Sequence, residues 1–122
     1  MIKKILIKII LVVIVLFFQF YECNQKNGTK TIEIGAILPL TGVGAEVGNY
    51  NKESMLYAKN KFDNRFKKYN YEIKINFEDS KSNPKDGLLA FKKLDSQKNI
   101  SIYNIQMSSV NNAITNSLNN KN

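Results

Sequence analysis

The sequence predicts an α/β protein whose strands and helices alternate as β-α-β-α-β-α around a parallel sheet. Short apolar runs at 32–38, 71–78 and 100–105 have the length and composition of strands. Each run is followed by a stretch with apolar residues at spacings of three and four, as in helices that bury one face. Strands separated by helices of this length pair in parallel, with right-handed crossovers.

The N-terminal segment 1–23 is predicted to be an export signal. Three lysines precede an uninterrupted apolar run at 9–18. This run of about 10 residues is shorter than the ~18–20 residues that cross a bilayer. The alternative to a cleaved signal is a permanent membrane anchor formed by 5–21. Lys8 interrupts this longer stretch, but a lysine side chain can extend its charged end to the membrane surface.

Cys23 is the only cysteine of the chain and stands where the apolar segment ends. This arrangement resembles bacterial lipoproteins, in which the cysteine after the apolar run receives lipid and becomes the mature N-terminus. The resemblance implies lipidation, and two or three acyl chains hold a protein firmly at a membrane. The alternative is an unpaired thiol without a role. We expect an exported protein, in the periplasm or on the outer face of a bacterial membrane.

The composition excludes several kinds of chemistry. With no histidine and one cysteine, the chain has neither a Ser-His-Asp or Cys-His catalytic arrangement nor a cysteine-rich zinc site or internal disulfide. The formal net charge is +8, but the lysines are scattered, and their one concentration at 59–68 is predicted to be the solvated side of a helix. A nucleic-acid partner is not expected, because such proteins cluster basic residues on one surface.

The polar segment 24–31 is predicted to be a flexible tether. The first strand follows at 32–38 and is bounded by Pro39, and a glycine-rich loop extends to Gly48. A helix is predicted at about 51–68, because four apolar residues recur there on one helical face. These residues are Met55, Ala58, Phe62 and Phe66.

The second strand, at 71–78, alternates apolar with polar and charged residues, which predicts a half-buried strand with a charged outer face, as at a sheet edge. The turn after it opens the second helix. Asn83 is suited to cap this helix, Pro84 fits its first position and Asp86 adds negative charge to its first turn. The predicted buried face consists of Leu88, Phe91 and Leu94.

The third unit is a strand at 100–105 and a helix capped by Ser108 or Ser109. The residues predicted to point inward from this helix are Val110, Ala113, Ile114 and Leu118.

Ligands of parallel sheets bind beyond the carboxyl ends of the strands. Two loops are predicted to reach that edge, at 39–48 and 106–109. The second places two serine hydroxyl groups beside the exposed N–H groups of a helix N-terminus, which attract carboxylate or phosphate. The alternative is that Ser109 is an ordinary N-cap.

Three segments of the sequence match a known family. They are Ile-Glu-Ile-Gly-Ala-Ile-Leu-Pro-Leu-Thr-Gly at 32–42, Glu-Asp-Ser-Lys-Ser-Asn-Pro-Lys at 78–85 and Ala-Phe-Lys-Lys-Leu at 90–94. In these segments, and in the distance between the first two, the chain resembles the branched-chain amino-acid binding proteins, which are type 1 periplasmic solute-binding proteins of ABC importers. The resemblance extends over about 31–118 and is most specific at 32–42.

The resemblance implies that the chain binds an amino acid and is not an enzyme, with an ABC importer permease as partner and with no cofactor or metal. In the family, the loop after the first strand faces the cleft between two lobes, so Leu40, Thr41 and Val47 would lie near the side chain of the ligand. The serines that open the third helix commonly bind the α-carboxylate. The matching positions here are Ser108 and Ser109.

Members of this family have two lobes and several hundred residues, and hinge closure around a ligand requires both lobes. We therefore expect 32–122 to be part of the N-terminal lobe, as in a truncated gene product or one piece of a split reading frame, with weak binding or none by itself. Where the family usually has glycine after the third strand, this chain has Ile105-Gln106-Met107.

Two other function classes remain open. The first is a dinucleotide-binding enzyme of the Rossmann type, because Gly42, Gly44 and Gly48 follow a strand, and Glu78 or Asp79 ends the next strand. The spacing differs from that of the dinucleotide-binding fingerprint, because the acid lies about 35 residues after the glycines instead of ~20. The second is a small membrane-attached interaction protein whose basic surface contacts anionic lipid.

Overall fold

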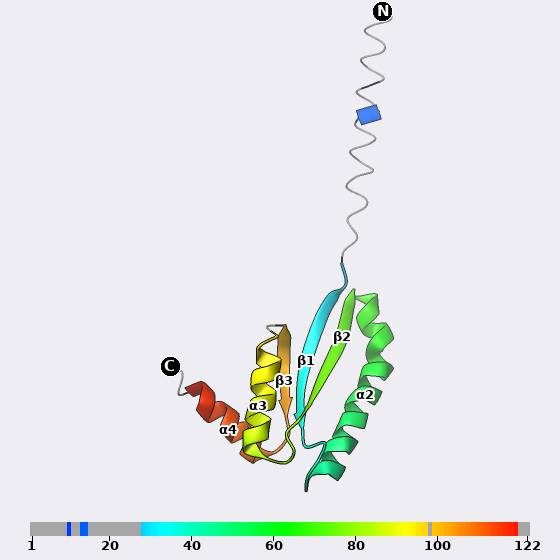
Figure 1. Cartoon of the computed structure of the whole chain (residues 1–122). Helices are drawn as coiled ribbons and strands as arrows, with labels where there is room; N and C mark the ends of the chain where they lie inside the picture. The colour runs from blue at the N-terminus through cyan, green and yellow to red at the C-terminus, as the bar shows by residue number, and fades with distance from the viewer. Residues whose placement is uncertain (1–9, 11–12, 15–27, 98, 120–122) are drawn as a thin grey trace, which may run out of the picture.

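The computed structural model of the chain describes residues 10, 13, 14, 28–97 and 99–119. It is an α/β structure, and its elements follow the predicted alternation (Figure 1). In chain order they are β1 (Lys30–Leu38), α2 (Ala45–Lys68), β2 (Tyr71–Asp79), α3 (Pro84–Asp95), β3 (Ile100–Ile105) and α4 (Ser108–Asn119).

The predicted export signal lies outside the described residues except at three isolated positions, and Cys23 lies outside them altogether. In the part that is described, no helix combines the length and the apolar character that crossing a membrane requires.

The sheet is parallel throughout, as predicted, and its strands lie in the order β2-β1-β3. β1 pairs with β2 over its whole length and with β3 from Glu33 onwards. The register of the β1–β3 pair shifts between Glu33 and Ile34, which marks a bulge or a similar irregularity. β1 is therefore the central strand, and the described sheet has β2 and β3 as its edges.

The helices form two layers, with α2 on one face of the sheet and α3 and α4 on the other (Figure 1). Neighbouring positions along a strand face opposite ways, so β1 supplies side chains to both layers. Ile34 lines a cavity together with Met55 of α2, whereas Ile37 packs with α3 and α4.

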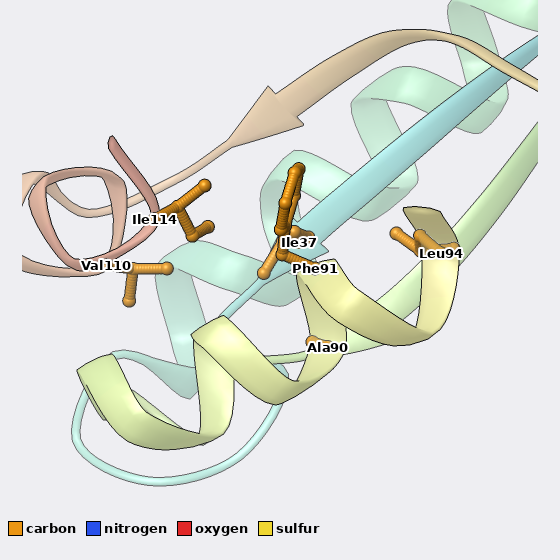
Figure 2. Packing of buried hydrophobic residues seen from close by; sticks show 6 residues of the cluster. All are labelled: Ile37, Ala90, Phe91, Leu94, Val110 and Ile114. Carbon is orange, nitrogen blue, oxygen red and sulfur yellow. The ribbon is translucent and has the colours of Figure 1, made fainter. Parts of the chain in front are cut away.

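The main core lies between the sheet and the pair α3 and α4 (Figure 2). Its buried residues are Ile37, Ala90, Phe91, Leu94, Val110 and Ile114. The ring of Tyr103 on β3 packs against this cluster, 5.0 Å from the ring of Phe91. A Cβ atom at Gly87 would overlap the side chain of Val110. Glycine at this position therefore lets α3 and α4 approach each other closely.

α2 packs more loosely against its face of the sheet. The four apolar residues predicted for one face do share it, and together with strand residues they line a cavity of about 280 Å³. The lining residues are Ile34, Met55, Ala58, Lys59, Phe62, Phe66, Ile73 and Ile75. Phe62 remains 41% exposed. Gly48 is the one buried residue of this 24-residue helix.

The first strand and the first helix both begin earlier than predicted. β1 begins at Lys30, inside the predicted tether, because the N–H of Lys30 donates to the carbonyl oxygen of Asn70 (2.8 Å) and extends the pairing with β2. α2 begins at Ala45, so part of the predicted glycine-rich loop is helical. Its first turn packs directly on the chain after β1, since a Cβ atom at Gly48 would overlap the carbonyl oxygen of Pro39.

Two predictions for the last helix were wrong. Ser108 and Ser109 both lie inside the first turn of α4, so neither is its N-cap. The carbonyl of Met107 accepts the hydrogen bond from the N–H of Asn111 (3.0 Å), which puts Met107 in the capping position. Leu118 is 43% exposed instead of buried, because it lies one turn beyond the last residue of the core cluster.

Candidate functional site

The connections after β1 and β3 leave the sheet at its carboxyl edge. The chain passes from β1 to β2 on one side and then to β3 on the other, and ligands of open α/β sheets bind where the strand order switches in this way. The N–H of Gln106 donates to the carbonyl of Ile37 (3.0 Å), and the amide of Asn51 donates to the side-chain oxygen of Gln106 (3.3 Å). These bonds hold the connection after β3 against both β1 and α2.

Asp79, the last residue of β2, holds the loop after β1 in place. Its Oδ1 accepts hydrogen bonds from the backbone N–H groups of Leu40 (2.9 Å), Thr41 (3.2 Å) and Lys81 (2.7 Å). Its Oδ2 accepts a hydrogen bond from the hydroxyl of Thr41 (2.6 Å). One carboxylate therefore connects the loop after β1 with the turn after β2.

The hydrogen bonds to Asp79 determine its charge. Burial raises the pKa of Asp79, but the donors on Thr41, Lys81 and Leu40 together outweigh burial, and the net result is a pKa below the ordinary value. Such donors stabilise the ionised carboxylate and not the protonated acid. The loop after β1 is thus held by a charged group at neutral pH.

The turn after β2 has an unusual backbone that the same network supports. Lys81 (φ 50°) and Ser82 (φ 56°) are both left-handed, as in a type I′ turn, and the N–H of Asn83 donates across it to the carbonyl of Ser80 (2.8 Å). The hydroxyl of Ser82 accepts from the N–H of Gly44 (2.9 Å). As predicted, Asn83 caps α3: its side-chain Oδ1 accepts a hydrogen bond from the N–H of Lys85, the second residue of the helix (2.8 Å).

The N-terminus of α4 opens on a cavity of about 500 Å³. The cavity is lined by Tyr103, Asn104, Ile105, Met107, Ser108 and Asn111. Both serines of the first turn are exposed. The N–H groups of a first helical turn have no acceptor within the helix, and the helix dipole favours negative charge there. This end of α4 therefore has the chemistry to bind a carboxylate or another small anion.

The structure separates the site residues that the sequence predicts into two groups. Leu40 is half-buried and Thr41 is exposed, and both donate to Asp79. Val47 lies in the first turn of α2 and is 60% exposed. The cavity that Ser108 lines includes none of these three residues. The two groups share the carboxyl edge of the sheet but do not line one cavity.

Sequence reasoning missed the amide side chains that join α2 to β3. Besides the bond between Asn51 and Gln106, the amide of Asn104 donates to the sulfur of Met55 (3.3 Å). The signal for this contact was Asn104, an asparagine near the carboxyl end of a mostly apolar strand.

Acidic side chains at the end of β2 already have partners. Asp79 binds the loops, and Glu78 forms an ion pair with Lys93 of α3 (2.7 Å). These contacts do not favour a dinucleotide site, in which one of these acids would bind the ribose. Within the described ranges, no three or more His, Cys, Asp or Glu side chains gather where they could hold a metal ion.

No protein-family model, curated protein or solved structure matches this chain. A function for this chain is therefore inferred from two sources. One is the geometry of the carboxyl edge of the sheet, and the other is the resemblance of the sequence segments described above.

Proposed function

We propose that the chain is the extracytoplasmic solute-binding component of an ABC importer for amino acids, with branched-chain amino acids as the ligand class. The observation that carries the proposal is the meeting, at one sheet edge, of the loop after β1 and the serine-bearing N-terminus of α4. The sequence segments that resemble the branched-chain amino-acid binding proteins include this loop, the turn after β2 and part of α3.

The two groups of residues suit the two ends of an apolar amino acid. In the proposed binding mode, the α-carboxylate accepts hydrogen bonds from the serine hydroxyls and the N–H groups of the first turn of α4. Leu40 and the exposed Val47 contact the apolar side chain of the ligand. Thr41 is a positioning residue, because its hydroxyl donates to Asp79 and fixes the loop.

The backbone after β3 supports the resemblance further. Met107 has a φ of 78°, in the left-handed region that glycine adopts most easily. The family usually has glycine after the third strand, so this chain keeps a glycine-like conformation in the segment where the family has the glycine itself.

We expect the described surface to bind an amino acid weakly. Thr41, Ser108 and Ser109 are exposed, and ligand sites of high affinity bury most of the ligand. A Kd of about 1 mM, which corresponds to about 4 kcal/mol, is the affinity that such an open site suggests.

Titration of the full chain with L-leucine in detergent micelles, followed by amide shifts in nuclear magnetic resonance, tests the carboxylate site. The double variant Ser108→Ala, Ser109→Ala is expected to raise the Kd by roughly tenfold or more, since a lost hydrogen bond to a charged group costs about 1.5 kcal/mol or more. Ser54→Ala on α2 is the matched control, with no change expected. Equal Kd values for the double variant and the unmodified chain would rule out this site.

The proposal includes export and attachment to the outer face of a bacterial membrane, through 1–23 or through lipid on Cys23. When the chain is produced in bacteria with labelled fatty acid, the label is expected in the protein, and Cys23→Ser is expected to remove it. Label retained by this variant would contradict lipidation at Cys23.

A further inference from the structure

In the described part of the chain, all exposed aromatic side chains belong to α2 or to the residue that follows it. They are Tyr50, Tyr57, Phe62 and Tyr69. From Tyr57 onwards they are interleaved with exposed basic residues on one side of the helix, at spacings of three and four residues. We call this set the α2 stripe, and its members are Tyr57, Lys61, Phe62, Arg65, Lys68 and Tyr69.

The basic and aromatic groups of the α2 stripe lie against one another. The Nζ atom of Lys61 is 5.8 Å from the ring centre of Tyr57 and 5.9 Å from that of Phe62. The Cζ atom of Arg65 is also 5.9 Å from the ring centre of Phe62. A cation at this distance is attracted by the face of the ring. The α2 stripe therefore presents positive charge and ring surface together.

Acidic residues do not neutralise the α2 stripe. After Glu53 the helix has one acid, Asp63, and this residue forms an ion pair with Lys67, outside the stripe. The basic groups of the stripe form no ion pair within the described ranges. Phe62 also lines the cavity under α2, so the charge adjoins exposed apolar surface. Basic residues beside exposed apolar residues are typical of helices that lie in a membrane–water interface.

The α2 stripe ends where the chain enters the fold. The N–H of Lys30 donates to the carbonyl oxygen of Asn70 (2.8 Å), so β1 begins beside the end of the stripe (Figure 1). Cys23 precedes Lys30 by seven residues, and a chain of this length spans at most about 25 Å. Attachment through 1–23 or through lipid on Cys23 therefore keeps the stripe close to the membrane.

We propose that the α2 stripe binds the headgroups of anionic phospholipids in the membrane to which the chain is attached. The proposal rests on the attachment that the proposed function includes. Each Lys or Arg near an anionic lipid surface is attracted to it, and tyrosine rings concentrate at the level of the headgroups.

Position favours lipid over nucleic acid as the anionic partner, because the short connection keeps the stripe near the bilayer and export separates the chain from nucleic acids. The contact also leaves the candidate amino-acid site at the far end of α2. The first turn of this helix lies at the carboxyl edge of the sheet, where the N–H of Gly44 donates to the hydroxyl of Ser82 (2.9 Å).

Paramagnetic relaxation in nanodiscs tests the contact. The full chain is reconstituted in discs of phosphatidylcholine alone and of equal parts phosphatidylcholine and phosphatidylglycerol, each with a trace of lipid that carries a spin label on its headgroup. The amides of 57–69 are expected to relax roughly fivefold faster in the anionic discs, and this difference should shrink at high salt. The amides of α3 are expected to show no difference. Equal relaxation of 57–69 in the two kinds of disc would overturn the proposal.

Two triple variants with the same change in charge show whether the α2 stripe itself is responsible. Lys61→Gln, Arg65→Gln, Lys68→Gln is expected to remove most of the faster relaxation in anionic discs, a change of roughly fivefold. The control has three exposed lysines of α3 replaced, on the other face of the sheet, and no change is expected. It is Lys85→Gln, Lys92→Gln, Lys93→Gln. Equal losses in both variants would mean that net charge attracts the lipid, and the proposal would fail.

The same experiment separates failure of this proposal from failure of the proposed function. A chain that enters neither kind of disc would contradict the attachment, and the contact of the stripe with lipid would fall with it. A chain that enters both kinds without faster relaxation in the anionic discs would overturn the contact alone. If single-stranded RNA shifts the amides of 57–69 in neutral discs and anionic lipid does not affect them, the partner is a nucleic acid and the proposal is wrong.

Discussion

α3 and α4 contribute four and two buried residues to their face of the sheet, whereas α2, twice as long as either helix, contributes only Gly48 among the described residues. The first face is held by a continuous apolar cluster, and the second contains a cavity of about 280 Å³. At the start of α2, hydrogen bonds replace apolar packing: Asp79 and Ser82 bind the loop that leads into the helix. Apolar burial therefore holds the face under α3 and α4, whereas hydrogen bonds hold the loop of the candidate site at the start of α2.

The largest effect is expected on the α3 and α4 face. Leu94 is fully buried, so Leu94→Ala leaves a cavity and is expected to lower the free energy of unfolding by about 2–5 kcal/mol in urea denaturation. Phe62→Ala on α2 is expected to cost less than about 1–2 kcal/mol, because Phe62 is already 41% exposed. The comparison of the two faces fails if Phe62→Ala costs as much as Leu94→Ala. Leu89→Ala, at an exposed position of α3, controls for helix propensity.

An intermediate effect is expected at the hydrogen-bonded start of α2. Asp79→Asn removes the charge that four hydrogen bonds stabilise, and a loss of about 1–3 kcal/mol in the free energy of unfolding is expected at pH 7. Glu53→Gln, which removes a charge at an exposed position of α2, is the matched control. Equal stability of the two variants would show that the carboxylate does not hold the loop.

The carboxylate of Asp79 should also make the free energy of unfolding depend on pH. Folding lowers the pKa of Asp79, so its contribution to stability is complete above the ordinary value of about 3.9 and is lost as the pH falls from there through the folded pKa. The stability difference between the unmodified chain and Asp79→Asn should therefore narrow below about pH 4. Urea denaturation at pH 7 and pH 3 measures this difference, and a constant difference would contradict the assignment.

The smallest effect is expected from filling the cavity under α2. Ala58 is exposed where it lines this cavity, which is open to solvent, and Ala58→Leu is expected to cover more of the apolar lining and raise the free energy of unfolding by about 0.5–2 kcal/mol. Ala58→Gln, of similar length but polar, should give no such gain. A loss of stability with leucine would mean that α2 packs on the sheet more tightly than the cavity indicates.

Periodicity in the sequence was sufficient to predict the alternation of strands and helices and the parallel sheet, because each signal is local. The cap at Asn83 and the proline at the start of α3 were also confirmed, since both act within one helical turn. The periodicity did not predict the strand order β2-β1-β3. That order depends on which strands pair along their edges when the chain folds, and these strands are far apart in sequence.

The candidate site was less predictable, because its contacts join residues that are far apart in sequence. Asp79 lies 38 residues from Thr41, and Asn51 lies 55 residues from Gln106. The start of α2 was placed too late for a related reason. Glycines suggested a loop, but Gly48 is needed within the helix because its first turn packs against Pro39. The serines of α4 were predicted as an anion site and as a cap; the cap is wrong, and the anion site stays a prediction.

The measurement that tests the proposed function most directly is a comparison of L-leucine with NAD as ligands of the unmodified full chain, by amide shifts in nuclear magnetic resonance. We predict that L-leucine at several millimolar shifts the amides of 40–44 and 106–109 together, and that NAD at the same concentration does not. Shifts in these two loops with NAD alone, or no shift in either loop with L-leucine, would contradict the account of this sheet edge as an amino-acid site.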